Sequence, residues 1–131
     1  WRVFAIGGMG EGFWAFGDTS GAPTSWNAYT AARPIYAPAY IGKTTVNDGI
    51  HWVGTREGVE DFEELSMLKD AIGRCEDATL KAAAQTVLAD AVKAVNGNAG
   101  DNTAFAWSAG TNPFVVDAQL GKVRAMLERM R

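Results

Sequence analysis

An aromatic residue and an acid stand four positions apart near the start of the chain, within the segment 12–18, GFWAFGD. If this run forms a buried strand, Trp14 and Asp18 share one face, because residues of equal parity point the same way. An indole ring can cover the apolar face of a pyranose while a carboxylate accepts hydrogen bonds from its hydroxyls, and ligands of parallel β/α folds lie at the carboxyl ends of the strands. The pair therefore predicts one wall of a sugar site. The alternative is that Trp14 packs in the core and Asp18 only begins a turn.

Residues 19–52 contain Ser, Thr, Pro, Asn and Gly at turn spacing and are interrupted by aromatic side chains. Such a loop is far longer than the usual connection, and loops of this length commonly carry function. We expect Trp26 and Tyr40 to add to the proposed sugar-binding wall.

A dense group of charges occupies residues 55–65, where Arg56 and Glu57 precede an apolar stripe, and Glu60 and Asp61 follow. The group predicts either the capped start of a helix or a charge network at the rim of a barrel. In the second case we expect Arg56 to be buried and paired with Glu57 or Asp61.

Other chemistry finds little support in the residue pattern. His51 is the only histidine and Cys75 the only cysteine, so no metal set with a recognised spacing can be assembled, and we predict no metal. The glycine-rich residues 7–12 lack the following helix that a dinucleotide loop requires, so we predict no cofactor and prefer a helix end that leads into a strand. The acidic residues 60–64 are typical of a solvated helix face.

The elements that would position these residues differ between the two halves of the chain. Apolar residues at three- and four-residue spacing predict a helix from about residue 59. Its stripe consists of Val59, Phe62, Leu65, Leu68, Ile72 and Cys75. Asp77 caps a second predicted helix that stops at Asn96-Gly97, and Asn112-Pro113 begins a third. The apolar stripe of the third helix consists of Val116, Leu120, Val123, Leu127 and Met130.

Composition excludes several classes of partner. The net charge of −3 over 131 residues leaves no dense basic face, so we predict no nucleic-acid binding. No apolar run approaches the roughly 20 residues that span a bilayer, so we predict no membrane partner.

One segment carries a family resemblance. Residues 56–65, REGVEDFEEL, resemble the R-E-G-[IV]-E-D-[YF]-E-x-L signature of a bacterial glycoside-hydrolase-like domain, related to the catalytic domain of β-N-acetylgalactosaminidases. The upstream aromatic segment, the long loop and a late arginine, Arg124, are similar in order. The resemblance implies a (β/α)8 barrel, in which residues 12–18 are the last strand and residues 56–74 the helix that follows.

The resemblance also implies that this chain is the carboxy-terminal part of a longer protein. We predict an α/β fragment, with residues 1–75 as the last β/α unit and residues 76–131 as a mainly α-helical region packed on it. The catalytic acid pair of the family has no counterpart here, so the catalytic residues are unknown and the isolated chain is expected to be inactive. Its partners would be carbohydrate and either the remainder of the barrel or a partner chain. The resemblance alone suggests secretion or a periplasmic location. The alternative function is a non-catalytic structural or protein-interaction module.

Overall fold

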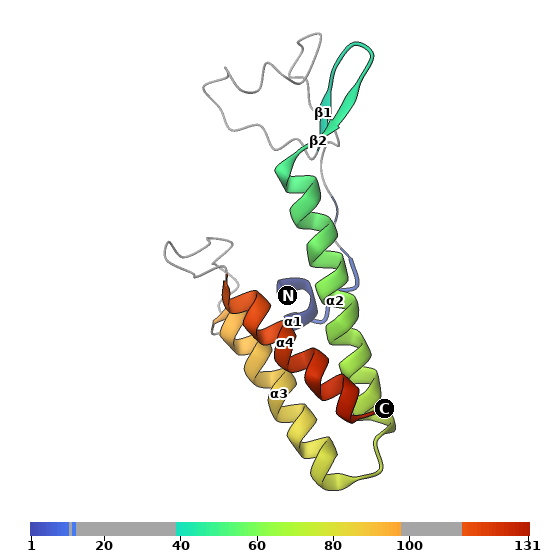
Figure 1. Cartoon of the computed structure of the whole chain (residues 1–131), viewed down its shortest axis with the longest axis vertical. Coiled ribbons are helices and arrows are strands. Elements are labelled where there is room, and N and C mark those ends of the chain that lie inside the picture. The colour runs from blue at the N-terminus through green and yellow to red at the C-terminus, as the bar shows by residue number, and fades with distance from the viewer. Residues whose placement is uncertain (11, 13–38, 98–113) are drawn as a thin grey trace. The chain divides into compact units, whose positions relative to one another are not determined.

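The computed structural model describes residues 1–10, 12, 39–97 and 114–131 (Figure 1). Along the chain its elements are α1 (Arg2–Ala5), β1 (Ala39–Ile41), β2 (Val46–Asp48), α2 (Ile50–Arg74), α3 (Ala78–Asn96) and α4 (Phe114–Arg129). They divide between two compact units. The helical unit comprises residues 1–10 and 60–131, and the hairpin unit comprises residues 11–59.

The core of the helical unit forms where residues 60–74 of α2 meet α3 and α4. Leu65, Leu68 and Val123 are completely buried there. The same cluster contains Ile72, Ala84, Ala91 and Met126. Leucine side chains of this kind each contribute roughly 1.5–3 kcal/mol on burial, so this cluster is the main source of stability in the unit.

Helix α3 begins and ends at local signals in the sequence. One carboxylate oxygen of Asp77 accepts hydrogen bonds from the backbone N–H groups of Thr79 at 2.8 Å and Leu80 at 3.0 Å, which have no partner inside the helix. At the other end Gly97 has a φ of 65°, and its N–H donates to the carbonyl of Lys93. The predicted cap at Asp77 and stop at Asn96-Gly97 are therefore confirmed.

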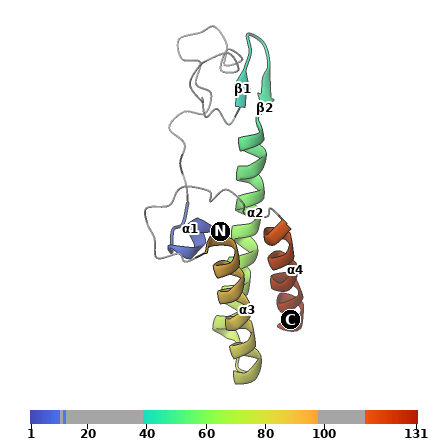
Figure 2. The ribbon, with the colours of Figure 1, turned by 90° about the vertical axis from the view of Figure 1, so that its left-hand side faces the viewer.

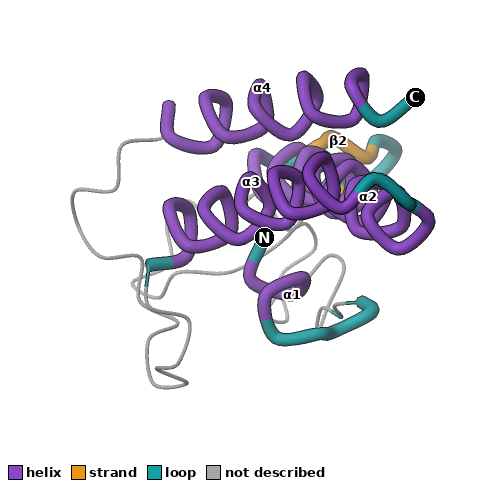
Figure 3. Tube along the Cα trace, turned by 90° about the horizontal axis from the view of Figure 1, so that it is seen from below, coloured by secondary structure: helices purple, strands orange, loops and turns teal. Residues whose placement is uncertain are grey.

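Small residues let α3 lie close to its neighbours. Figure 3 shows α3 between α1 and α4, and Figure 2 shows α3 running antiparallel to α2. Ala84 and Ala91 are seven residues apart, about two turns, and both are completely buried on the face of α3 that meets the core. A methyl group at these positions lets backbones approach more closely than a leucine would.

The hairpin unit has a two-stranded antiparallel sheet followed by the first turns of α2. Ala39 pairs with Asp48, Tyr40 with Asn47 and Ile41 with Val46. The N–H of Gly42 donates to the carbonyl of Thr45 at 2.7 Å and closes the turn between the strands. The prediction of one loop over residues 19–52 is therefore wrong for residues 39–41 and 46–48, and α2 already begins at Ile50.

The barrel prediction is wrong. The described parts of the chain form helices and one antiparallel hairpin, and they contain no parallel strand pair. Helix α2 follows β2 directly, and β2 is three residues long with every residue exposed, whereas a barrel strand is covered on both faces. The proposed last strand at residues 12–18 falls almost entirely outside the described residues. The three predicted helices are present, as α2, α3 and α4.

Candidate functional site

The predicted sugar-binding residues are only partly within the described chain. Trp14, Asp18 and Trp26 lie outside the described residues, so their roles stay predictions. Tyr40 lies in β1 at the centre of the hairpin, opposite Asn47, and its side chain is half-buried.

Arg56, Glu57, Glu60 and Asp61 all lie on α2, but in different surroundings. Arg56 forms an ion pair with Glu57 at 2.9 Å, and the two side chains are 63% and 59% exposed. The prediction that Arg56 is buried is wrong, although its pairing with Glu57 is observed. The buried residues of α2 within the core begin at Leu65, roughly two and a half turns further on, so Arg56 lies beyond the packed face. Glu60 is also exposed.

Asp61 differs from the other three because it is half-buried. Its Oδ2 accepts a hydrogen bond of 2.6 Å from the indole Nε1 of Trp1. Burial raises the pKa of Asp61 above its ordinary value, because the charged form loses hydration, although the indole N–H acts in the opposite direction. Asp61 therefore ties the first residues of the chain to α2.

Phe4 provides a second link between α1 and α2. Its ring meets that of Phe62 edge to face, with centroids 5.8 Å apart and planes at 76°. The ammonium group of Lys69 lies 5.8 Å from the centroid of the same ring, within cation–π range. Polar and aromatic contacts together hold this four-residue helix against the unit.

Glu64 joins α2 to α4 through Arg124. The guanidinium donates from Nε to Oε2 and from Nη2 to Oε1, both at 2.7 Å. This bidentate geometry is the strongest form of an arginine–carboxylate contact, and it raises the pKa of Arg124. No local signal in the sequence pairs Glu64 with Arg124, since they stand 60 positions apart.

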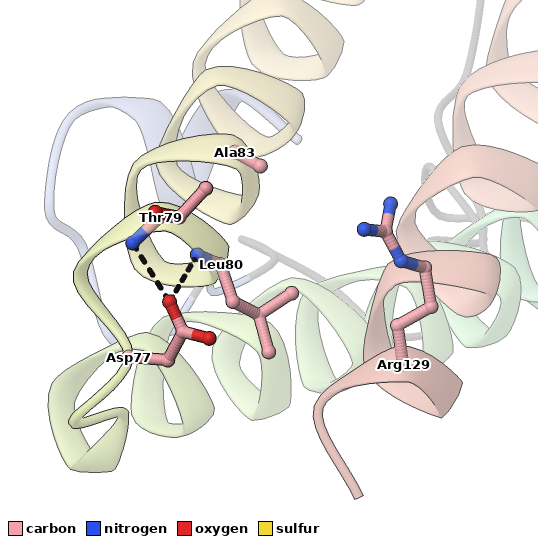
Figure 4. Close-up of a pocket in the computed structure, with 5 residues that line it drawn as sticks. All are labelled: Asp77, Thr79, Leu80, Ala83 and Arg129. Carbon is pink, nitrogen blue, oxygen red and sulfur yellow. Dashed lines mark hydrogen bonds between the residues drawn. The ribbon is translucent and has the colours of Figure 1, made fainter.

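A shallow hollow lies where α3 begins and α4 ends (Figure 4). It is lined by Asp77, Thr79, Leu80, Ala83 and Arg129. The Asp77 carboxylate is already engaged as the cap of α3, and Figure 4 shows Arg129 projecting from the opposite side. Because the acid is committed to backbone N–H groups, this hollow is a poor place for acid–base chemistry.

A second hollow, of about 320 Å³, lies between α2 and α4; we term it the α2–α4 groove. Its apolar lining consists of Met67, Ala71, Leu127 and Met130, and its charged lining of Asp70, Arg74 and Arg131. Met67 is 54% exposed although the adjacent Leu68 is completely buried. Leu127 and Met130 were predicted as part of the apolar stripe of the last helix, whereas Met67 and Ala71 fall outside the stripe predicted for α2.

Comparisons of this chain with family models, curated proteins and solved structures found no match. The resemblance of residues 56–65 to the glycoside-hydrolase-like signature therefore stays a prediction from sequence. Within the described ranges there is no group of three or more His, Cys, Asp or Glu side chains that could hold a metal ion. None of the helices described is both long and apolar enough to cross a bilayer.

Proposed function

We propose that this chain is a non-catalytic interaction module whose α2–α4 groove receives a segment of another protein. The observation that carries the proposal is the hollow itself, which is lined by Met67, 54% exposed, and by the partly buried Ala71, Leu127 and Met130 beside the core. Methionine is frequent at binding surfaces because its unbranched, polarisable side chain adapts to different partners. Apolar side chains gathered in a surface hollow are typical of a contact site.

The contacts of three acidic residues in the helical unit favour a binding role over catalysis. Asp61 accepts from an indole, Glu64 from a guanidinium and Asp77 from backbone N–H groups. Each carboxylate thus has a structural use. A general acid and base would instead face a common cavity with room for substrate.

Site-specific photocrosslinking would test this function. A photoreactive phenylalanine analogue replaces Met67 in the chain expressed in its source cells, and a matched variant carries it at Gln85, which is exposed on α3 away from the groove. We expect one defined protein to be crosslinked from position 67 and not from position 85.

The crosslinked protein is then purified and titrated with the chain. Binding should be saturable, should weaken at least tenfold with Met67→Gln and should be unchanged with Gln85→Glu. Equal binding by Met67→Gln, or no position-specific crosslink, would contradict the proposal.

The carbohydrate role remains a separate proposal from the sequence, based on Trp14, Asp18, Trp26 and Tyr40. Calorimetric titration of the chain with N-acetylgalactosamine tests it directly, with Trp14→Ala and Tyr40→Ala as the variants that should lose binding. We expect no turnover of aryl N-acetylhexosaminides by the chain itself. Absence of any sugar binding in the calorimeter would remove this proposal and leave the interaction module.

A further inference from the structure

The residues that line the α2–α4 groove follow helical spacing on both of its sides. On α2 they are Met67, Asp70, Ala71 and Arg74, which recur at three- and four-residue intervals and so share one face. On the other side Leu127, Met130 and Arg131 have the same spacing. Residues 67–74 of α2 span roughly 10 Å at 1.5 Å per residue, which is enough for about two turns of a bound helix.

The charged residues of the groove are mostly basic, whereas the chain as a whole is acidic. The chain as a whole has a net charge of −3, whereas the groove is lined by two arginines and one aspartate. Among the residues that the structure describes, neither Arg74 nor Arg131 has a carboxylate within ion-pair distance, although Asp70 is one helical turn from Arg74. Within the described ranges, Arg74 and Arg131 are therefore cations without a paired carboxylate beside the apolar lining of the groove.

We infer that the occupant of the α2–α4 groove is an acidic amphipathic peptide segment. Its apolar side chains would contact Met67, Ala71, Leu127 and Met130, and its carboxylates would pair with Arg74 and Arg131. The inference rests on the proposed function and adds the chemistry of the partner. A basic segment would instead place like charges against both arginines, at a cost in affinity.

The complex should be weak and reversible. A contact limited to two helical turns buries less surface than a standard stable interface, and small interfaces of this kind belong to transient encounters. We expect a Kd on the order of 10–100 μM at moderate salt. Rising ionic strength should weaken the complex, because the charges lie at an exposed rim.

Selection from a random 16-residue peptide library tests the inference. The immobilised full chain is the target, and the Met67→Gln variant removes peptides that bind elsewhere. Because Met67 is half-exposed, the substitution should leave the fold intact, which circular dichroism would verify. Peptides that depend on the groove should be enriched in Asp and Glu over Lys and Arg, with apolar residues at three- and four-residue spacing.

The best peptide is labelled and measured by fluorescence anisotropy. Arg74→Gln should weaken its binding about twofold to fivefold, the upper part of the range for one exposed charge pair. The matched control is Arg56→Gln, an exposed arginine elsewhere on α2, which should leave the affinity unchanged.

The possible results test the acidic character of the partner separately from the role of the groove as a binding site. Groove-dependent peptides without acidic enrichment, or an acidic peptide insensitive to Arg74→Gln, would overturn the acidic partner while the interaction module stands. A library that yields no peptide sensitive to Met67→Gln would overturn the groove as a binding site and the inference with it.

Discussion

Two ion pairs of α2 differ in what they connect. Arg56 and Glu57 are adjacent in sequence, and each side chain is more than half exposed. Glu64 reaches Arg124 on another helix, and its side chain is only 24% exposed. Glu57 and Glu64 are both acidic and stand about two turns apart on one helix. Glu57 nevertheless makes a local, solvated contact, whereas Glu64 links two helices. The difference lies in the apolar neighbours, since Leu65 and Leu68 begin the packed face beside Glu64.

The boundary between the two units falls between these two pairs, at Glu60. Residues 50–59 of α2 belong to the hairpin unit and residues 60–74 to the helical unit. Within the first stretch Trp52, Val53 and Val59 are partly exposed, whereas the second contains Leu65, Leu68 and Ile72 in the core. Regular helical hydrogen bonds therefore continue through α2 while the burial of its apolar side chains changes at the boundary.

The largest loss of stability among variants of α2 is expected at Leu68. Leu68→Ala should lower the free energy of unfolding by about 2–5 kcal/mol, because a completely buried leucine is lost and a cavity remains. Met67→Ala is the matched control on the next residue and should change the free energy by less than about 0.5 kcal/mol, since Met67 is half-exposed. Urea unfolding monitored by circular dichroism gives both values. Similar costs for the two variants would contradict the assigned orientation of α2.

An intermediate effect is expected at Asp61, which belongs to the packed part of α2. Asp61→Ala should cost about 1.5 kcal/mol at neutral pH, because the indole N–H of Trp1 loses its acceptor in a half-buried site. Glu63→Ala, on an exposed residue two positions further along α2, is the control and should cost less than about 0.5 kcal/mol. Equal values would mean that the Trp1 contact does not contribute to folding.

The raised pKa of Asp61 adds a dependence on pH. Since the folded chain holds this proton to a higher pH than the unfolded chain, its stability should fall as pH rises from the ordinary value of 3.8 through the raised value. Asp61→Asn removes the titration and keeps a hydrogen-bond acceptor. The stability of Asp61→Asn relative to wild type should therefore increase between pH 3 and pH 7. A constant difference across this range would contradict the desolvation of Asp61.

The amino-acid sequence predicts the core correctly where burial follows the helical repeat. The spacing of Leu65, Leu68 and Ile72 identified the core face of α2, and Asp77 and Gly97 marked the ends of α3. These are local signals, so a single stretch of sequence contains them. Leu120 and Val123 of the third predicted stripe are also buried, with Met126 buried between Val123 and Leu127.

The errors arose where structure depends on distant residues. The strands of the hairpin are three residues long, too short to show alternation of apolar and polar residues. The exposed position of Arg56 could not be read from its neighbours, because an acidic residue beside an arginine is compatible with a buried or a solvated pair. The α2–α4 groove requires two helices to meet, and no single segment contains both of its walls.

Glycines in α2 provide a smaller test of whether its two parts unfold together. Gly54 lies in the hairpin unit and Gly73 in the helical unit, and at neither would an added Cβ meet another atom within 4 Å. Gly73→Ala should stabilise the chain by about 0.5–1 kcal/mol, because alanine loses less backbone entropy in a helix. If α2 unfolds as one element, Gly54→Ala gives the same increase in the unfolding midpoint.

If residues 50–59 instead open independently, Gly54→Ala should leave the global midpoint unchanged. The substitution would then slow amide hydrogen exchange only within this stretch. We expect this second result, because the core residues of α2 begin at Leu65. A full midpoint increase with Gly54→Ala would show that the boundary at Glu60 does not separate two folding units.

The smallest contributions to the free energy of unfolding are expected from the two ion pairs themselves. Double-mutant cycles with Arg56→Ala and Glu57→Ala, and with Arg124→Ala and Glu64→Ala, isolate the coupling within each pair. We expect no measurable coupling for Arg56 and Glu57, because both side chains are mostly exposed and a local contact in water gains little. The pair of Glu64 and Arg124 should show a measurable favourable coupling, since its bidentate geometry fixes α4 against α2 and Glu64 is largely shielded. Urea unfolding of the variants at low and high salt gives the coupling free energy of each pair. Added salt should reduce the coupling between Glu64 and Arg124, because it screens their charges, and should leave Arg56 and Glu57 without measurable coupling. Equal couplings would mean that solvent screens both contacts alike, and the distinction between a local and a tertiary ion pair on α2 would then have no energetic basis.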